Sequence, residues 1–128
     1  MKKYIIIIAS IAGIMACNKD KITNTLAPVI TITSPTSGQM ISSGDSVLIQ
    51  ATVTDEDMHE VTFKVANAAD TSIVYFADGV HSHDVDVNYS NKFVTPAVGS
   101  HTNVVLMVHA EDHNSHESDK SVTFAFMP

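Results

Sequence analysis

The chain has 128 residues, and its fourteen acidic side chains outnumber seven lysines, with no arginine, for a formal net charge of −7. This length is enough for one small domain and a tether, and it excludes a separate cofactor-binding domain or a two-domain catalytic cleft. The acidic balance disfavours nucleic-acid binding, which relies on basic surfaces.

The N-terminal segment has the features of an export signal. Lys2 and Lys3 precede an apolar run from Tyr4 to Ala16 that is too short to cross a bilayer. The run ends in the sequence Ile-Met-Ala-Cys, which resembles the lipobox of bacterial lipoproteins, and Cys17 is the only cysteine. The resemblance implies that residues 1–16 are a removed signal peptide and that acyl chains on Cys17 hold the protein on a membrane. The alternatives are an ordinary signal peptide or a buried free thiol.

Residues 17–27 are expected to be the acylated cysteine followed by a flexible tether, because they are polar and lack an apolar period. Position 18 is Asn, whereas the inner-membrane retention signal of many bacterial lipoproteins has Asp directly after the acylated cysteine. The resemblance therefore implies an outer-membrane lipoprotein, on the periplasmic face or at the cell surface. Asn18 to Lys21 also loosely resembles the surface-export signal of Bacteroidetes lipoproteins.

From Val29 onward, apolar residues recur at every second position, which predicts an all-β domain over residues 28–128. The expected strands cover 29–34 with a short continuation at 39–41, then 46–53, 61–65, 71–77, 84–89, 102–110 and 122–126. Seven strands at this spacing match an immunoglobulin-like Greek-key β-sandwich. Phe63, Phe76, Phe124 and Phe126 are expected to contribute most to its core.

Three segments resemble bacterial Ig-like domains: Pro28 to Val47, Ala51 to Asp55, and Gly99 to Asp112. The resemblance covers nearly all of residues 28–127, although the disulfide and tryptophan of antibody domains are absent. Two His-rich segments narrow this resemblance to small His-rich Ig-like lipoproteins of Bacteroidetes, whose domain has no known function. They are His81-Ser82-His83 and the segment from Glu111 to His116.

Most of the seven histidines are expected at one end of the sandwich. Successive strands alternate in direction, so the N-terminus and every second connection share one end. That end receives His59, His81, His83, His109, His113 and His116, together with Asp55, Asp57 and Asp112. Only His101 belongs to the opposite end.

These histidines suggest a transition-metal site. His81 and His83 are two residues apart, so on a strand both rings would project from one face. Imidazole suits Zn and Cu, and carboxylates can complete the shell or orient the rings. The preferred ligands are His81 and His83 with His113, His116 or both, followed by His109 and by Asp112 as ligand or ring-orienting group. The outer candidates are His59, Asp55 and Asp57.

Two alternatives to this site remain open. The histidines can be solvated loop residues, with Asp55 and Asp112 hydrogen-bonding turn backbone as corner residues. A calcium site is a further alternative, because Asp55 to Asp57 with Glu111 and Asp112 faintly resembles the inter-domain sites of cadherins.

The sequence therefore predicts an outer-membrane or surface-anchored lipoprotein that presents an Ig-like binding module with a divalent Zn or Cu site. The alternative is an adhesion or assembly accessory domain that contacts protein or glycan partners without metal. An enzyme is not expected, because no serine lies in a nucleophile-elbow context and no glycine-rich phosphate loop follows a strand.

Overall fold

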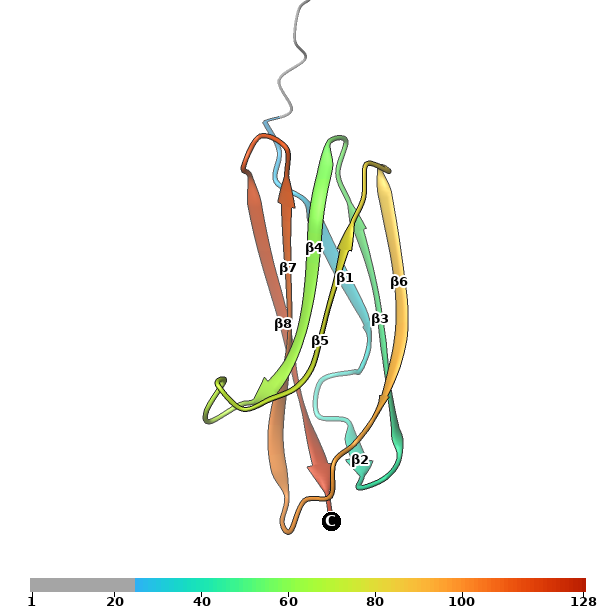
Figure 1. Cartoon of the computed structure of the whole chain (residues 1–128), viewed down its shortest axis with the longest axis vertical. Coiled ribbons are helices and arrows are strands. Elements are labelled where there is room, and N and C mark those ends of the chain that lie inside the picture. The colour runs from blue at the N-terminus through green and yellow to red at the C-terminus, as the bar shows by residue number, and fades with distance from the viewer. Residues whose placement is uncertain (1–24) are drawn as a thin grey trace, which may run out of the picture.

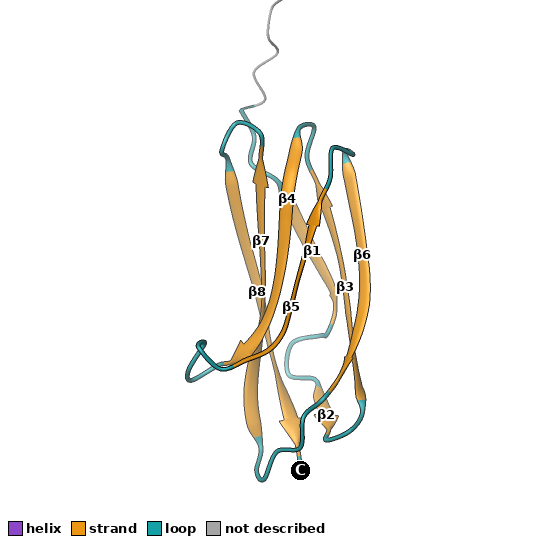
Figure 2. Cartoon of the chain, viewed as in Figure 1, coloured by secondary structure: helices purple, strands orange, loops and turns teal. Residues whose placement is uncertain are grey.

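The computed structural model describes residues 25–128, which form two antiparallel-rich sheets packed face to face (Figures 1 and 2). The three-stranded sheet has the order β1-β3-β6, with β1 at Val29–Ser34, β3 at Ser46–Thr54 and β6 at Asp86–Val94. The five-stranded sheet has the order β2-β8-β7-β4-β5, with β2 at Met40–Ser42, β8 at Glu117–Met127, β7 at Thr102–Asp112, β4 at Met58–Asn67 and β5 at Val74–His81. This architecture confirms the predicted Ig-like β-sandwich. The proposed signal peptide, Cys17 and most of the tether lie outside the described residues.

The first apolar run is divided between the two sheets. β1 pairs antiparallel with β3, whereas β2 pairs in parallel with β8. Gly38, at a φ of 75°, lies between them, and its N–H donates to the carbonyl of Thr123 on β8 at 2.9 Å. Glycine adopts this left-handed conformation at no steric cost, so it allows the crossing. The short continuation expected after the first run thus closes the second sheet.

Several strands extend further than the apolar alternation indicates. β8 begins at Glu117 instead of Val122, because cross-strand pairing with β7 continues through residues whose side chains are polar. β5 starts three residues later than expected. Asp70 forms a turn there, in which its Oδ1 accepts bonds from the Ser72 N–H at 3.0 Å and the Ser72 hydroxyl at 2.6 Å.

The core lies between the sheets and is built from the inward side chains of alternating residues. Phe63, Phe124 and Phe126 are at most 1% exposed. The Phe63 ring on β4 stacks on Tyr89 of β6 with centroids 3.7 Å apart, which joins the two sheets. Phe76 is only partly buried, contrary to expectation, because β5 is an edge strand. The buried core runs from residue 30 to residue 126, so residues 25–128 contain the whole sandwich.

A polar bridge connects the edge strands β5 and β6. The Tyr89 hydroxyl donates to Asp78 Oδ2 at 2.5 Å, and Asn91 Nδ2 donates to the same oxygen at 3.1 Å. Burial and the hydrogen bond to Asp78 raise the pKa of Tyr89 to about 12. The bond from Tyr89, with those from Gly79 and Asn91, lowers the pKa of Asp78. At neutral pH the phenol therefore donates to a charged carboxylate, which is a strong form of hydrogen bond.

The β3–β4, β5–β6 and β7–β8 turns gather at one end of the sandwich, which is called the loop end below (Figure 1). The chain also enters β1 from that end, and His101 precedes β7 at the opposite end. Residues 25–128 contain no helix long and apolar enough to cross a membrane.

The position of the core predicts unequal costs for truncating two phenylalanines. Phe63→Ala should lower the free energy of unfolding by about 3–5 kcal/mol, because it removes a fully buried ring and leaves a cavity. Phe76→Ala should cost clearly less, because its ring is partly exposed. Urea denaturation of residues 25–128 measures both, and equal losses would contradict the assigned core.

Candidate metal site at the loop end

Four imidazole rings meet at the loop end and are called the histidine quartet: His59, His81, His83 and His113. The ring centroids of His59 lie 4.9 Å from His81 and 4.7 Å from His113. Those of His83 lie 4.9 Å from each of the same two rings. The contacts are edge to face, and His81 and His113 face each other across the quartet at 6.5 Å. Each of the four rings therefore contacts two others, and the rings come from three separate segments of the chain.

A β-bulge places His59 in the quartet. Met58 pairs with Asp112 and Glu60 pairs with Glu111, so His59 is the extra residue on β4. Met58 and Val61 are both buried, while His59 and Glu60 between them point away from the core. Bulges re-aim side chains in this way. From the sequence, His59 was only an outer candidate, although the three-residue spacing between the buried Met58 and Val61 is the signal of the bulge.

His81 and His83 reach the quartet by a different route from the one expected. β5 ends at His81, so His83 is not on the same strand face and that part of the interpretation was wrong. The chain instead turns: the Ser82 N–H donates to the His59 carbonyl at 3.2 Å, and the Asp84 N–H donates to Ser82 Oγ at 3.1 Å. The turn still leaves the two rings in contact.

His113 is held by bonds between two turns. Its N–H donates to the Asp57 carbonyl at 3.0 Å, and Asn114 Nδ2 donates to Asp57 Oδ2 at 3.0 Å. Asp57, an outer candidate for metal ligation, therefore joins the β3–β4 and β7–β8 turns. These bonds fix the position of His113 beside His59.

Asp112 and His116 form a separate pair below the β7–β8 turn. Asp112 is 1% exposed, and its Oδ1 accepts the N–H groups of Asn114 and His116, both at 2.8 Å. Its Oδ2 lies 2.7 Å from His116 Nδ1. Burial would raise the pKa of Asp112, but the hydrogen bonds from His116 and Asn114 outweigh it and lower this pKa. Asp112 thus orients the His116 ring, and among the described residues His116 makes no ring contact with the quartet.

Asp55 has a similar role in the β3–β4 turn. It is 6% exposed, its N–H donates to the Val85 carbonyl at 2.9 Å, and its Oδ1 accepts the Asp57 N–H at 2.7 Å. Asp55 and Asp112 therefore both hydrogen-bond turn backbone, as one alternative expected.

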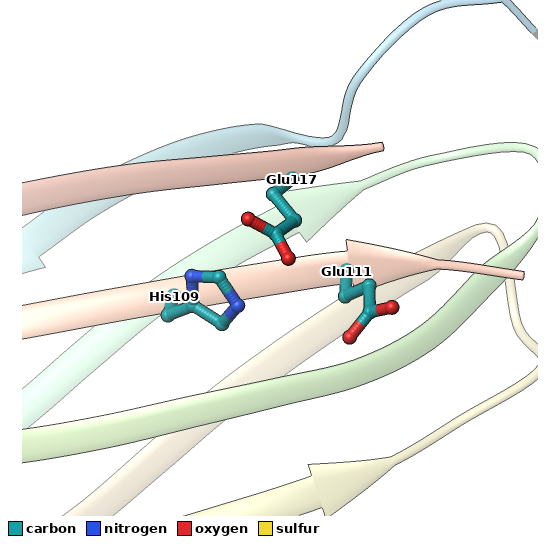
Figure 3. A group of neighbouring side chains, drawn as sticks. All are labelled: His109, Glu111 and Glu117. Atoms are coloured by element: carbon teal, nitrogen blue, oxygen red, sulfur yellow. The ribbon is translucent and has the colours of Figure 1, made fainter. Parts of the chain in front are cut away.

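His109 lies on the outer face of the five-stranded sheet, apart from the quartet. Its Nδ1 is 2.9 Å from Asp119 Oδ1, and it forms a second group with Glu111 and Glu117 (Figure 3). One ligand atom from each of these three residues lies within 4.8 Å of the other two. Glu117 and Asp119 were not predicted from the sequence, because only the register between β7 and β8 brings them to His109 and Glu111.

Neighbouring rings of the quartet are about as far apart as histidine rings on one metal ion, although in residues 25–128 the group whose ligand atoms already lie within 4.8 Å of one another is His109, Glu111 and Glu117. Zn–N bonds of about 2.0–2.1 Å place the centroids of neighbouring ligand rings about 5 Å apart. Four of the quartet distances are 4.7–4.9 Å. The rings pack edge to face, so coordination of one ion requires ring rotations that aim a nitrogen of each toward the centre. A surface depression lined by His59, Glu111, Asp112, His113 and Ser115 adjoins these rings.

The comparison with known protein families agrees with the fold. The family model described as Bacterial Ig domain matches residues 28–105. An engineered protein of known structure has a TM-score of 0.55 and 20% identity, over 79% of this chain and 20% of that chain. Fibronectin(III)-like modules of Clostridium thermocellum CbhA give a TM-score of 0.49 and 20% identity, over 77% of this chain and 93% of that chain. Murine CRIg gives a TM-score of 0.46 and 12% identity, over 78% and 96%. No match was found among curated proteins.

The Asp112 cap predicts an acid-dependent loss of stability. A carboxyl whose pKa is lowered by folding stabilises the native state above its ordinary pKa of 3.8, and this stabilisation disappears as the pH falls through the lowered value. Asp112→Asn removes the ionisable group, so its stability should fall less steeply than that of the parent below about pH 4. Urea denaturation from neutral pH to about pH 2.5 measures this. Asp45→Asn, in an exposed turn, is the control, and identical acid profiles for the two variants would contradict the assignment.

Proposed function

The chain belongs to the bacterial Ig domain family, and we propose that it is a membrane-anchored binding module that takes up a divalent transition metal, Zn or Cu. The observation that carries this proposal is the histidine quartet, with four neighbouring ring distances of 4.7–4.9 Å. Ig-like sandwiches typically bind rather than catalyse, and their loops present binding residues on a rigid scaffold.

The chemistry of the quartet favours borderline transition metals. Four imidazoles offer nitrogen ligands only, which suit Cu²⁺ and Zn²⁺ better than calcium or magnesium. His81, His83 and His113 are exposed and His59 is half-buried. An ion can therefore reach the rings directly from solution. This accessibility supports capture of an external ion more than a buried structural role.

Removal of one quartet ring should weaken metal binding specifically. Loss of a group that only hydrogen-bonds a metal ligand weakens metal binding by roughly ten- to hundredfold. His81→Ala removes a ligand itself, so it should raise the Kd for Cu²⁺ and Zn²⁺ by at least this factor. His101→Ala removes one exposed histidine at the opposite end and is the matched control. Isothermal titration of residues 25–128 measures both variants.

Weak multi-site heat that is the same in His81→Ala, His101→Ala and the parent would count against the metal site. The Ig-like domain would then be better explained as an adhesion or assembly module. Its protein or glycan partners would be sought with the same domain as bait, and exposed sheet edges are the natural contact surfaces.

Anchoring through Cys17 is the second part of the proposal, and it is supported by the sequence alone. Cys17→Ser should abolish incorporation of a labelled fatty acid and release the protein from the membrane fraction, because acyl chains provide the anchor. Asn18→Asp keeps the acylation site and should move the protein from the outer to the inner membrane. Labelling of Cys17→Ser, or a soluble parent protein, would refute the anchor.

A further inference from the structure

We propose a second divalent-metal site on the outer face of β7 and β8, formed by His109, Glu111 and Glu117 and called the face site below. It takes an ion with mixed nitrogen and oxygen preference, such as Zn²⁺ or Mn²⁺. The face site shares no ligand with the histidine quartet, so the inference stands independently of the function proposed above.

The sheet register builds the face site. His109 and Glu111 are two residues apart on β7 and therefore share a face, and Glu111 is paired directly with Glu117 on β8. The ligand atoms of the three side chains all lie within 4.8 Å of one another. Figure 3 shows the imidazole and both carboxylates gathered over the two strands. Ligands on paired strands of one sheet are held more precisely than ligands on loops.

Asp119 orients the imidazole for coordination. It pairs with His109 across the strands, and its Oδ1 lies 2.9 Å from His109 Nδ1. An Nδ1–H that donates to this carboxylate leaves Nε2 with the free lone pair. Metal-bound histidines commonly use this carboxylate–histidine arrangement, which fixes the tautomer and makes the ligand more basic.

The acidic side chains on this outer face of the sheet also favour a bound cation. Glu117, Glu111 and Glu60 form a row of neighbouring pairs across β8, β7 and β4. Like charges directly opposite each other destabilise a sheet. Within residues 25–128 the ion pairs are His109–Asp119 and His116–Asp112, so no lysine neutralises this row. A divalent ion between Glu111 and Glu117 would turn the repulsion into attraction.

Zinc titration in a quartet-deficient background tests the face site. The parent for this test is His59→Ala/His81→Ala in residues 25–128, and it should bind one Zn²⁺ by isothermal titration and native mass spectrometry. Adding Glu111→Gln/Glu117→Gln should weaken this binding more than about tenfold. Adding Asp119→Asn should weaken it about ten- to hundredfold, although Asp119 does not touch the ion. Asp45→Asn/Asp70→Asn removes the same charge elsewhere and should leave the affinity unchanged.

Thermal unfolding separates a ligand role from a structural one. Without metal, Glu111→Gln/Glu117→Gln should unfold at the same or a higher temperature than the parent, because charge repulsion is removed. With Zn²⁺, the parent should gain more stability than Glu111→Gln/Glu117→Gln. Unchanged Zn²⁺ affinity in Glu111→Gln/Glu117→Gln, or an equal loss in Asp45→Asn/Asp70→Asn, would overturn the face site. Neither result depends on whether the quartet binds metal, which the His81→Ala comparison decides separately.

Discussion

The pairing of β4 with β5 on one side and β7 on the other is the constraint that places the histidine quartet beside the acidic row. The register sets Glu60 opposite His81 and opposite Glu111. One strand therefore fixes where the quartet and the acidic row lie relative to each other. The stack of Phe63 on Tyr89 holds this strand against the opposite sheet, so the positions of the outer side chains follow from the core. Without that packing, histidines from three segments would lack a common frame.

The bulge at His59 adds a local correction to this frame. In a regular strand side chains alternate between the two faces, so one of the two residues between Met58 and Val61 would point into the core. The extra residue leaves both positions outward, so His59 joins the quartet while Glu60 joins the acidic row. A single bulge thus serves two neighbouring groups of different chemistry. Bulges commonly re-aim side chains in this way and are functional features of sheets, not defects.

The period-two pattern was sufficient to predict the fold, because alternation alone decides which residues face the core. Strand alternation also predicted that His59, His81, His83 and His113 share one end. It could not rank His59, because a bulge breaks the alternation on which the analysis relied. Nor could it find Glu117 and Asp119, whose relation to His109 exists only across strands. Phe76 was misjudged for a similar reason, since composition does not reveal which strand forms a sheet edge.

The direction of β1 links the sites to the proposed anchor. The chain enters the sandwich at the loop end, beside the turns that carry the quartet (Figure 1). About ten residues separate an acylated Cys17 from Pro28, and a chain of that length reaches at most about 35–40 Å when fully extended. The tether would therefore keep the quartet on the membrane-proximal end, while the face site lies on the flank of the sheet. An ion bound at the quartet would then lie close to the membrane to which the chain is proposed to be anchored.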